Sequence, residues 1–385
     1  MKSTALKLIA AVTLMFGFEV LVKAQTAQPL NVVTTAVPFL RISPDARSGG
    51  MGDLSIATSP DASSSYFNLG KVPFNTSQGG INITYTPWLR QLVNDVYLAS
   101  MAGYYKLGEN QAISASLRYF NLGSIQFTDS YGNIQGTGFP KEFGVDLGYS
   151  RKLSDKLGLG IGLKYIYSNL AAGAVSQAGN YKAGTSVAGD IGLYSNNTND
   201  AGQGWSFGVA LTNLGAKISY TDNPDQSDFI PANLGLGTTF TRVLDESNKI
   251  TFGLDLNKLL VPMAPSDSQG LANYHTQGVM SSWFKSFSDP GGFNEQLKEF
   301  QVSLGAEYWY NNQFALRAGY FYEDQTKGNR RYFTTGIGIK YNVFGLNFSY
   351  LIPSGSGNTQ NPLSNTLRFS LIFDFNNSES SGGSQ

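Results

Sequence analysis

The 385-residue chain has no cysteine and a single histidine, and only 14% of its residues are charged. Without cysteine the chain cannot form disulfide bonds, use a thiol nucleophile or carry an amino-terminal lipid on cysteine. One histidine disfavours zinc sites and hydrolytic triads. The 27 basic residues balance 27 acidic ones, so no broad charged footprint for nucleic acid exists. We therefore predict a non-enzymatic protein with no cofactor, no metal and no nucleic-acid partner.

Long apolar runs are also missing. After the amino terminus no stretch is as long as the roughly eighteen apolar residues of a membrane-spanning helix, so helical spans are not expected. At the amino terminus, Lys2 and Lys7 precede an apolar run over 8–18, and Ala24 is a small residue at a possible cleavage site. We predict a signal peptide over 1–24 and an exported chain that begins near Gln25.

The strongest pattern in the chain lies between Gln301 and Phe375. Apolar residues there fall on every second position, while small, polar and charged residues fill the positions between. A period of two puts the two sets on opposite faces of a sheet. A soluble sandwich would also show this alternation. The segments, however, run for about ten residues with Tyr and Phe at their ends, which is typical of strands that cross a bilayer.

These features predict an all-β fold, a transmembrane antiparallel β-barrel of about 14 strands over residues 79–375, followed by a polar tail over 376–385. The predicted strands are Gly80–Thr86, Val96–Lys106, Gln111–Phe120, Glu142–Arg151, Leu157–Tyr167, Thr185–Tyr194, Trp205–Thr212, Ala232–Thr241, Lys249–Asn257, Gln301–Tyr310, Gln313–Tyr322, Tyr332–Tyr341, Val343–Ile352 and Ser364–Phe375.

Short and long connections alternate along the predicted strands. Outer-membrane barrels have short periplasmic turns and long extracellular loops, and an even strand count brings both termini to the periplasm. We therefore predict an outer-membrane protein in contact with lipid, with periplasmic termini. The connection over 258–300 is the longest predicted extracellular loop.

Residues 25–78 lack the alternation, and Pro and Gly interrupt any regular element there. An irregular extension is one interpretation. Since apolar residues keep the segment from reading as a solvated linker, we favour a hatch or plug inside the barrel lumen, where irregular backbone at membrane depth is tolerated.

Part of this segment resembles the opening signature of the PorV family. The residues that carry the resemblance are the run Arg41-Ile42-Ser43-Pro44-Asp45-Ala46-Arg47-Ser48-Gly49-Gly50-Met51-Gly52-Asp53, then Ala57–Ala62 and Tyr66-Phe67-Asn68. PorV proteins are outer-membrane barrels of the type IX protein secretion system, related in fold to FadL-type fatty-acid transporters. The resemblance implies a fourteen-stranded barrel with an amino-terminal hatch. The hatch residues so singled out are Phe39, Arg41, Ile42, Pro44, Asp45, Arg47, Gly49, Gly50, Met51, Gly52 and Asp53.

The same resemblance implies a function in protein secretion. Such a protein would associate with the large translocon barrel of the SprA or Sov type. It would receive secreted cargo that carries the C-terminal signal domain and pass this cargo to an attachment complex at the cell surface.

Alternation places ten charged residues on the lumen face: Arg118, Asp146, Lys164, Asp190, Asp255, Glu307, Arg317, Lys340, Arg368 and Asp374. The two signs are mixed, whereas a selectivity filter would show a ring of one sign. We interpret these residues as a hydrated, salt-bridged interior that holds the hatch.

Within the loop over 258–300, five apolar residues recur at helical spacing: Val279, Met280, Trp283, Phe284 and Phe287. A loop helix folded onto its own rim is one interpretation. Because aromatic residues dominate binding hot spots, we favour a partner- or cargo-binding loop.

Two other functions stay open. A FadL-like barrel could transport hydrophobic small molecules. O-deacylation of lipopolysaccharide has been suggested for the family, although the scarcity of histidine argues against it.

Overall fold

The structure, a computed structural model, describes residues 32–88, 93–170, 181–223, 226–265, 267–288, 291–354 and 365–376. The predicted signal peptide and all but the first residue of the predicted tail lie outside these ranges. Among the described residues, no helix is long and apolar enough to cross a membrane.

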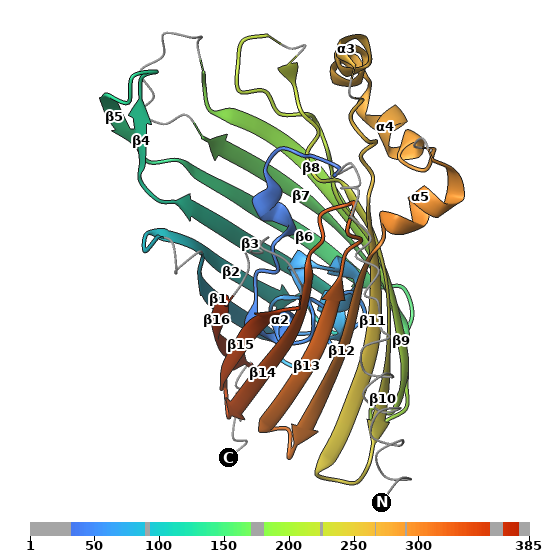
Figure 1. The fold of residues 1–385 in the computed structure, drawn as a ribbon. Coiled ribbons are helices and arrows are strands. Elements are labelled where there is room, and N and C mark those ends of the chain that lie inside the picture. Colours follow the sequence, from blue (N-terminus) through green and yellow to red (C-terminus); the bar gives the residue numbers. More distant parts are fainter. Residues whose placement is uncertain are drawn as a thin grey trace, which may run out of the picture. The chain divides into compact units, whose positions relative to one another are not determined.

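Fourteen antiparallel strands close into a barrel (Figure 1). The fold predicted from the alternation is therefore confirmed. Each strand pairs with its neighbour along the barrel, and β1 pairs with β16 to close it. The strands are β1 (Gly79–Pro87), β2 (Val96–Lys106), β3 (Gln111–Leu122), β6 (Lys141–Lys152), β7 (Leu157–Asn169), β8 (Gly184–Thr198), β9 (Gly204–Gly215), β10 (Asn233–Val243), β11 (Asn248–Leu259), β12 (Gln301–Tyr310), β13 (Phe314–Tyr322), β14 (Arg331–Tyr341), β15 (Phe344–Pro353) and β16 (Leu367–Phe375).

A small hairpin lies in the connection between β3 and β6, where the sequence predicted only a loop. It consists of β4 (Ile125–Thr128) and β5 (Ile134–Gly138). The Asp129 carboxylate holds its turn by accepting hydrogen bonds from the backbone N–H groups of Tyr131 and Asn133, each at 2.9 Å. Strands of four and five residues are too short to give a convincing alternation.

Large apolar side chains cover the outside of the barrel. Leu147 and Leu163 face each other across β6 and β7 and are 63% and 70% exposed, and Leu316 on β13 is 60% exposed. A soluble protein rarely leaves so many large apolar side chains uncovered. The outward face is therefore the lipid face of a transmembrane barrel, and no second sheet covers it in the described chain.

The two ends of the barrel differ in their connections. At the turn end, Asn311 and Asn312 take left-handed conformations with φ of 50° and 53°, which closes β12 and β13 in a tight hairpin. At the loop end lie the long connections, including the one that holds α3 (Ser268–Thr276), α4 (Val279–Lys285) and α5 (Gly292–Lys298).

The described part of the amino-terminal segment, residues 32–78, is called the hatch below. It contains η1 (Pro38–Arg41), α2 (Ala46–Gly49), η2 (Ser64–Tyr66) and η3 (Leu69–Phe74). Its last residues lie at the turn end, where Lys106 Nζ donates to the Asn75 carbonyl at 3.1 Å. Its first residues lie at the loop end, where Val33 packs in a cluster with Leu259 and Val261. The hatch therefore runs through the lumen from one end to the other.

Inward-facing glycines of the barrel wall lie directly against the hatch backbone. A Cβ atom added at Gly319 would come within 2.1 Å of the Gly52 nitrogen, and one at Gly305 within 2.6 Å of the Met51 carbonyl oxygen. On the other side of the lumen, a Cβ at Gly160 would meet Leu69 at 2.4 Å. Glycine is required at these positions because backbone approaches backbone too closely for a side chain.

Replacing Gly319 by alanine should push the hatch off the wall. The added methyl group has no room, so we expect a destabilisation of about 1–3 kcal/mol and faster hydrogen exchange in residues 44–56. Gly189→Ala is the matched control, because a Cβ there meets its nearest atom at an ordinary 3.6 Å. Equal exchange in the two variants would show that the hatch does not rest on Gly319.

Candidate functional site

The turn that follows α2 holds the hatch against the wall. Asp45 caps α2 by accepting from the Ser48 N–H at 3.2 Å. Gly52 and Asp53 then adopt left-handed conformations with φ of 68° and 62°. At Gly52 a side chain would clash with the Tyr320 backbone at 2.7 Å, so this position requires glycine both for its φ and for its space.

A buried ionic network joins α2 to the wall. Arg47 makes a bidentate contact with Glu307 of β12, with nitrogen–oxygen distances of 2.9 and 2.7 Å. The same carboxylate accepts from Arg317 Nε of β13 at 2.7 Å, and Arg47 also pairs with Asp61 of the hatch at 2.8 Å. Arg47, Glu307 and Arg317 are all buried. Bidentate guanidinium–carboxylate pairs fix orientation as well as charge, so this network sets the position of α2.

Wall side chains also satisfy the irregular hatch backbone. Asp255 of β11 accepts from the N–H groups of Ser55 and Ile56 at 2.6 and 2.9 Å. Gly52 donates to Thr334 Oγ1 at 2.7 Å. Buried backbone groups need partners, and outside helices and sheets these must come from side chains.

Arg118 holds the opposite side of the hatch. Its Nη1 donates to the Leu40 carbonyl at 2.5 Å, and its guanidinium lies 4.7 Å from the centre of the Tyr66 ring. Phe39 is fully buried beside it and stacks on Phe120 at a ring-centre distance of 6.5 Å. The predicted hatch residues Ile42, Pro44 and Met51 are buried or half-buried in the same segment.

The remaining lumen-facing charges form separate groups. Lys164 lies 3.1 Å from both Asp146 and Asp190. Lys340 pairs with Asp374 at 2.7 Å near the turn end.

Arg368 is the exception among the lumen-facing charges. It is fully buried under Gly49 and 3.8 Å from Asp53, and its three guanidinium nitrogens have no hydrogen-bond partner among the described residues. Close to it, Gly50 lies against Gly336 of the wall.

Burial shifts the ionisation of several hatch groups. It raises the pKa of Asp45 to about 6, with a further contribution from nearby Asp61. It lowers the pKa of Lys71, which is fully buried in η3, to about 8. Burial, followed by the neighbouring Arg330, lowers the pKa of Arg41 to about 10. In each case the low-dielectric surroundings disfavour the charged form.

The helices of the long loop expose apolar side chains. Met280 and Phe284 of α4 are 69% and 74% exposed, and Phe293 of α5 is 76% exposed. Phe287 and Leu297 are exposed as well. Of the other two residues singled out on this face, Val279 packs against the cluster around Tyr274, and Trp283 is half-buried. The predicted helix thus has an anchored side and an exposed side.

Ion pairs fix α5 to the barrel rim. Lys327, in the connection between β13 and β14, lies 2.8 Å from Glu295 and 3.2 Å from Glu299 at α5. Lys258 at the end of β11 pairs with Glu299 as well. Lys258, Glu299 and Lys327 are buried, so these ion pairs hold the carboxyl-terminal end of α5 in a fixed position.

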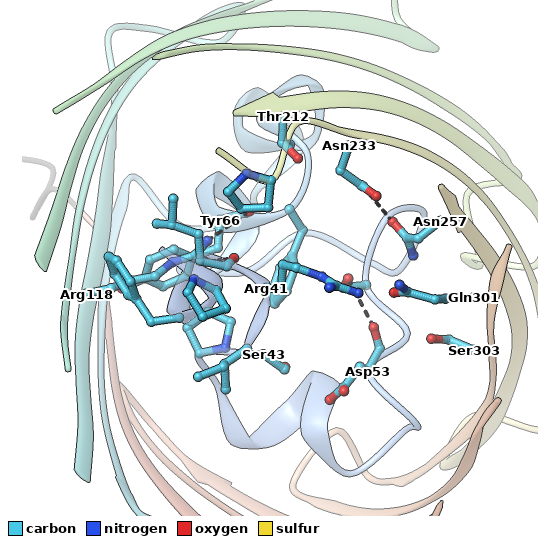
Figure 2. Close-up of a pocket in the computed structure, with 18 of the residues that line it drawn as sticks. Arg41, Ser43, Asp53, Tyr66, Arg118, Thr212, Asn233, Asn257, Gln301 and Ser303 are labelled. Carbon is cyan, nitrogen blue, oxygen red and sulfur yellow. Dashed lines mark hydrogen bonds between the residues drawn. The ribbon is translucent and has the colours of Figure 1, made fainter. Parts of the chain in front are cut away.

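A cavity of about 340 Å³ lies between the hatch and the loop-end rim (Figure 2). Hatch residues 38–44 form one side, with Arg41 in the middle of the view. Amide side chains at the ends of three neighbouring strands, Asn233, Asn257 and Gln301, form the other side. Alternation already puts these amides on the lumen face, because Asn257 shares the phase of Asp255. No pattern in the sequence predicts a cavity there.

Among the described residues, no three His, Asp or Glu side chains lie close enough together to hold a metal ion. His275 lies on α3, and its Nδ1 is 3.1 Å from the Ser227 carbonyl oxygen and 3.8 Å from Asp228. These contacts hold α3 to the connection between β9 and β10.

Comparison with known proteins identifies the family. A family profile described as "Type IX secretion system protein PorV" matches residues 24–266, more than half of the chain. The chain belongs to the PorV family. Among curated proteins none matches the sequence.

Solved structures support the fold. The toluene transporter TbuX of Ralstonia pickettii is similar at a TM-score of 0.51 and 12% identity, over 86% of this chain and 98% of that one. The monoaromatic hydrocarbon channel CymD is similar at a TM-score of 0.52 and 12% identity, over 86% of this chain and 97% of that one. A FadL homologue of Pseudomonas aeruginosa has a TM-score of 0.45 and 10% identity, over 89% of this chain and 99% of that one. The similarity to TbuX and CymD shows the barrel fold that the resemblance implied, and membership of the PorV family makes this barrel an outer-membrane one.

Glu307→Gln should loosen the hatch of this PorV-family protein. The change leaves Arg47 and Arg317 buried with one fewer charge partner, which typically costs about 3–5 kcal/mol. We expect a lower urea midpoint in detergent and protease cleavage within residues 44–61. The control is Asp374→Asn, because its partner Lys340 is 41% exposed and such pairs contribute at most about 1 kcal/mol. Unchanged hatch protection in Glu307→Gln would contradict the assigned role of the network.

Proposed function

We propose that this protein is a non-enzymatic membrane platform for protein secretion. It binds the large translocon barrel, receives cargo through the cargo's C-terminal signal domain and hands it to the attachment complex at the cell surface. In this proposal the loop end faces outward and the termini of the barrel face the periplasm. Membership of the PorV family supports secretion as the setting.

The observation that carries the proposal is the exposed apolar surface of α4 and α5. Met280, Phe284 and Phe293 are each more than two-thirds exposed at the loop end. Exposed apolar and aromatic side chains of this kind mark protein-binding surfaces, and aromatic residues supply most of the energy at hot spots. The ion pairs of Glu295 and Glu299 pre-order α5, so this part of the surface loses little conformational entropy when a partner binds.

The hatch gives the second part of the mechanism. Its backbone rests on wall glycines and its charges are paired with wall charges, so the lumen is filled at the level of α2 and η3. Cargo would therefore pass across the outer surface of the platform and not through its lumen.

Transport of hydrophobic small molecules is the competing function, since TbuX is a toluene transporter and CymD a monoaromatic hydrocarbon channel. The cavity of this chain is not purely apolar, because Arg41 and the amides of Asn233, Asn257 and Gln301 are among the groups that line it.

The proposal is tested by replacing the exposed side chains and leaving the helices in place. In the triple variant Met280→Ser, Phe284→Ser, Phe293→Ser we expect co-purification of cargo or of the translocon barrel to fall about fivefold or more, because each side chain is a candidate hot spot. Tagged protein is purified from mild-detergent membranes, and its partners are quantified by mass spectrometry.

Tyr131→Ser is the matched control, since Tyr131 is 90% exposed on the hairpin of β4 and β5. Heat-modifiable mobility on gels checks that each barrel is folded. Equal recovery of partners with the triple variant and the control would refute the role of α4 and α5.

A further inference from the structure

The cavity above the hatch has one wall of hydrogen-bonding groups. Asn233 Nδ2 donates to Asn257 Oδ1 at 2.9 Å, and Gln301 lies directly opposite Asn257 in the pairing of β11 with β12. Gln301 Nε2 donates to Glu323 Oε1 at 3.1 Å, whereas Asn233 Oδ1, Asn257 Nδ2 and Gln301 Oε1 have no hydrogen-bond partner among the described residues. The wall therefore offers donors and acceptors side by side.

The facing wall is aromatic. Trp88 and Phe120 lie 5.1 Å apart between ring centres, and Tyr66 lies beside them in the lining. The two rings are tilted by 48° to each other, and with Tyr66 they give this part of the lining an apolar, aromatic character. A ligand that fits both walls needs one apolar face and an edge of groups that both donate and accept hydrogen bonds.

The residues that line the cavity carry more positive than negative charge. Four guanidinium groups line it, those of Arg41, Arg118, Arg330 and Arg368. The carboxylates near them are Asp53, which is in the lining, and Glu323. Glu323 is already held by Arg330 at 2.7 and 2.8 Å, which leaves Arg41 with a long 3.5 Å contact to the same carboxylate.

Two further observations show that these cations are only partly compensated by carboxylates. Arg368 is fully buried without a hydrogen-bond partner in the described chain, and the lowered pKa of Arg41 reflects burial beside Arg330. A buried charge without full pairing is costly, so an added anionic group would be favourable here.

We propose that this cavity binds a short acidic saccharide of one or two sugar rings. Each sugar hydroxyl both donates and accepts, which suits the amide wall, and the C–H face of a sugar ring suits the aromatic wall. The carboxylate of the ligand pairs with Arg41. At about 340 Å³ the cavity lies near the lower limit of ligand pockets, which are about 300–1,000 Å³, and this limits the ligand to a small one.

This site is separate from α4 and α5, so the proposal does not rest on cargo binding. Free saccharide and the acidic sugar head group of a glycolipid share the required chemistry. The test therefore includes a probe for each source.

The test uses the full-length mature protein in lauryldimethylamine oxide, a detergent that contains no sugar. Tryptophan fluorescence, to which Trp88 contributes, is followed during titration with digalacturonic acid, maltose, toluene and a glucuronosyl diacylglycerol in mixed micelles. We expect saturable binding of digalacturonic acid, about tenfold weaker binding of maltose and no saturable signal with toluene. A stronger response to the glycolipid than to digalacturonic acid would assign the head group as the source.

Variants of the lining decide whether the signal comes from this cavity. Asn257→Ala with Gln301→Ala should weaken digalacturonic acid binding about tenfold or more, and Arg41→Gln should remove the preference over maltose. Asn197→Ala, an exposed amide at the turn end, is the control and should bind as the unchanged protein does.

Saturation-transfer NMR with the same probes gives a readout independent of fluorescence. Saturable binding of toluene alone, no saturation with any saccharide, or unchanged binding in the double amide variant would overturn the proposal.

Discussion

Contact between the hatch backbone and the glycine-lined inner wall is the constraint on which the rest of the structure depends. A barrel of this size would enclose an aqueous channel if its lumen were empty. Here Gly305 and Gly319 on one side and Gly160 on the other let the hatch lie against the wall without intervening side chains. The bonds of Arg47 and Arg317 to Glu307 then fix the orientation that the glycines allow.

A series of ion pairs connects the hatch to helix α5 at the loop end. Arg41 of the hatch contacts Glu323, and four residues further on Lys327 contacts Glu295 and Glu299 at α5. Helix α5 is thus joined to the rim of the barrel and, through the rim, to the hatch. A rigid support of this kind suits the proposed platform, because a surface that is already ordered loses little conformational entropy when it binds a large partner.

The sequence predicted the barrel well because a transmembrane strand must alternate along its whole length. Segments such as Gln301–Tyr310 carry that pattern without interruption, and the observed β12 has the same bounds. The same phase predicts which charged residues face the lumen. Which charges meet could not be predicted, because the pairing of Arg47 with Glu307 depends on how an irregular segment folds across 260 residues of chain. The hairpin of β4 and β5 was missed because its strands are too short for a periodic signal, and helix α3 was missed because too few of its residues, SQGLANYHT, are apolar to show helical spacing. The cavity was missed because it exists only where the hatch leaves space beneath the rim.

The central claim is that the hatch closes the lumen of a lipid-embedded barrel, and ion conductance tests it most directly. The purified mature protein and a deletion variant that lacks residues 32–75 are each inserted into planar lipid bilayers, and the current through each is recorded. The account predicts no single-channel steps for the intact protein and clear steps once the hatch is removed. Steps of open-pore size from the intact, folded protein would contradict it.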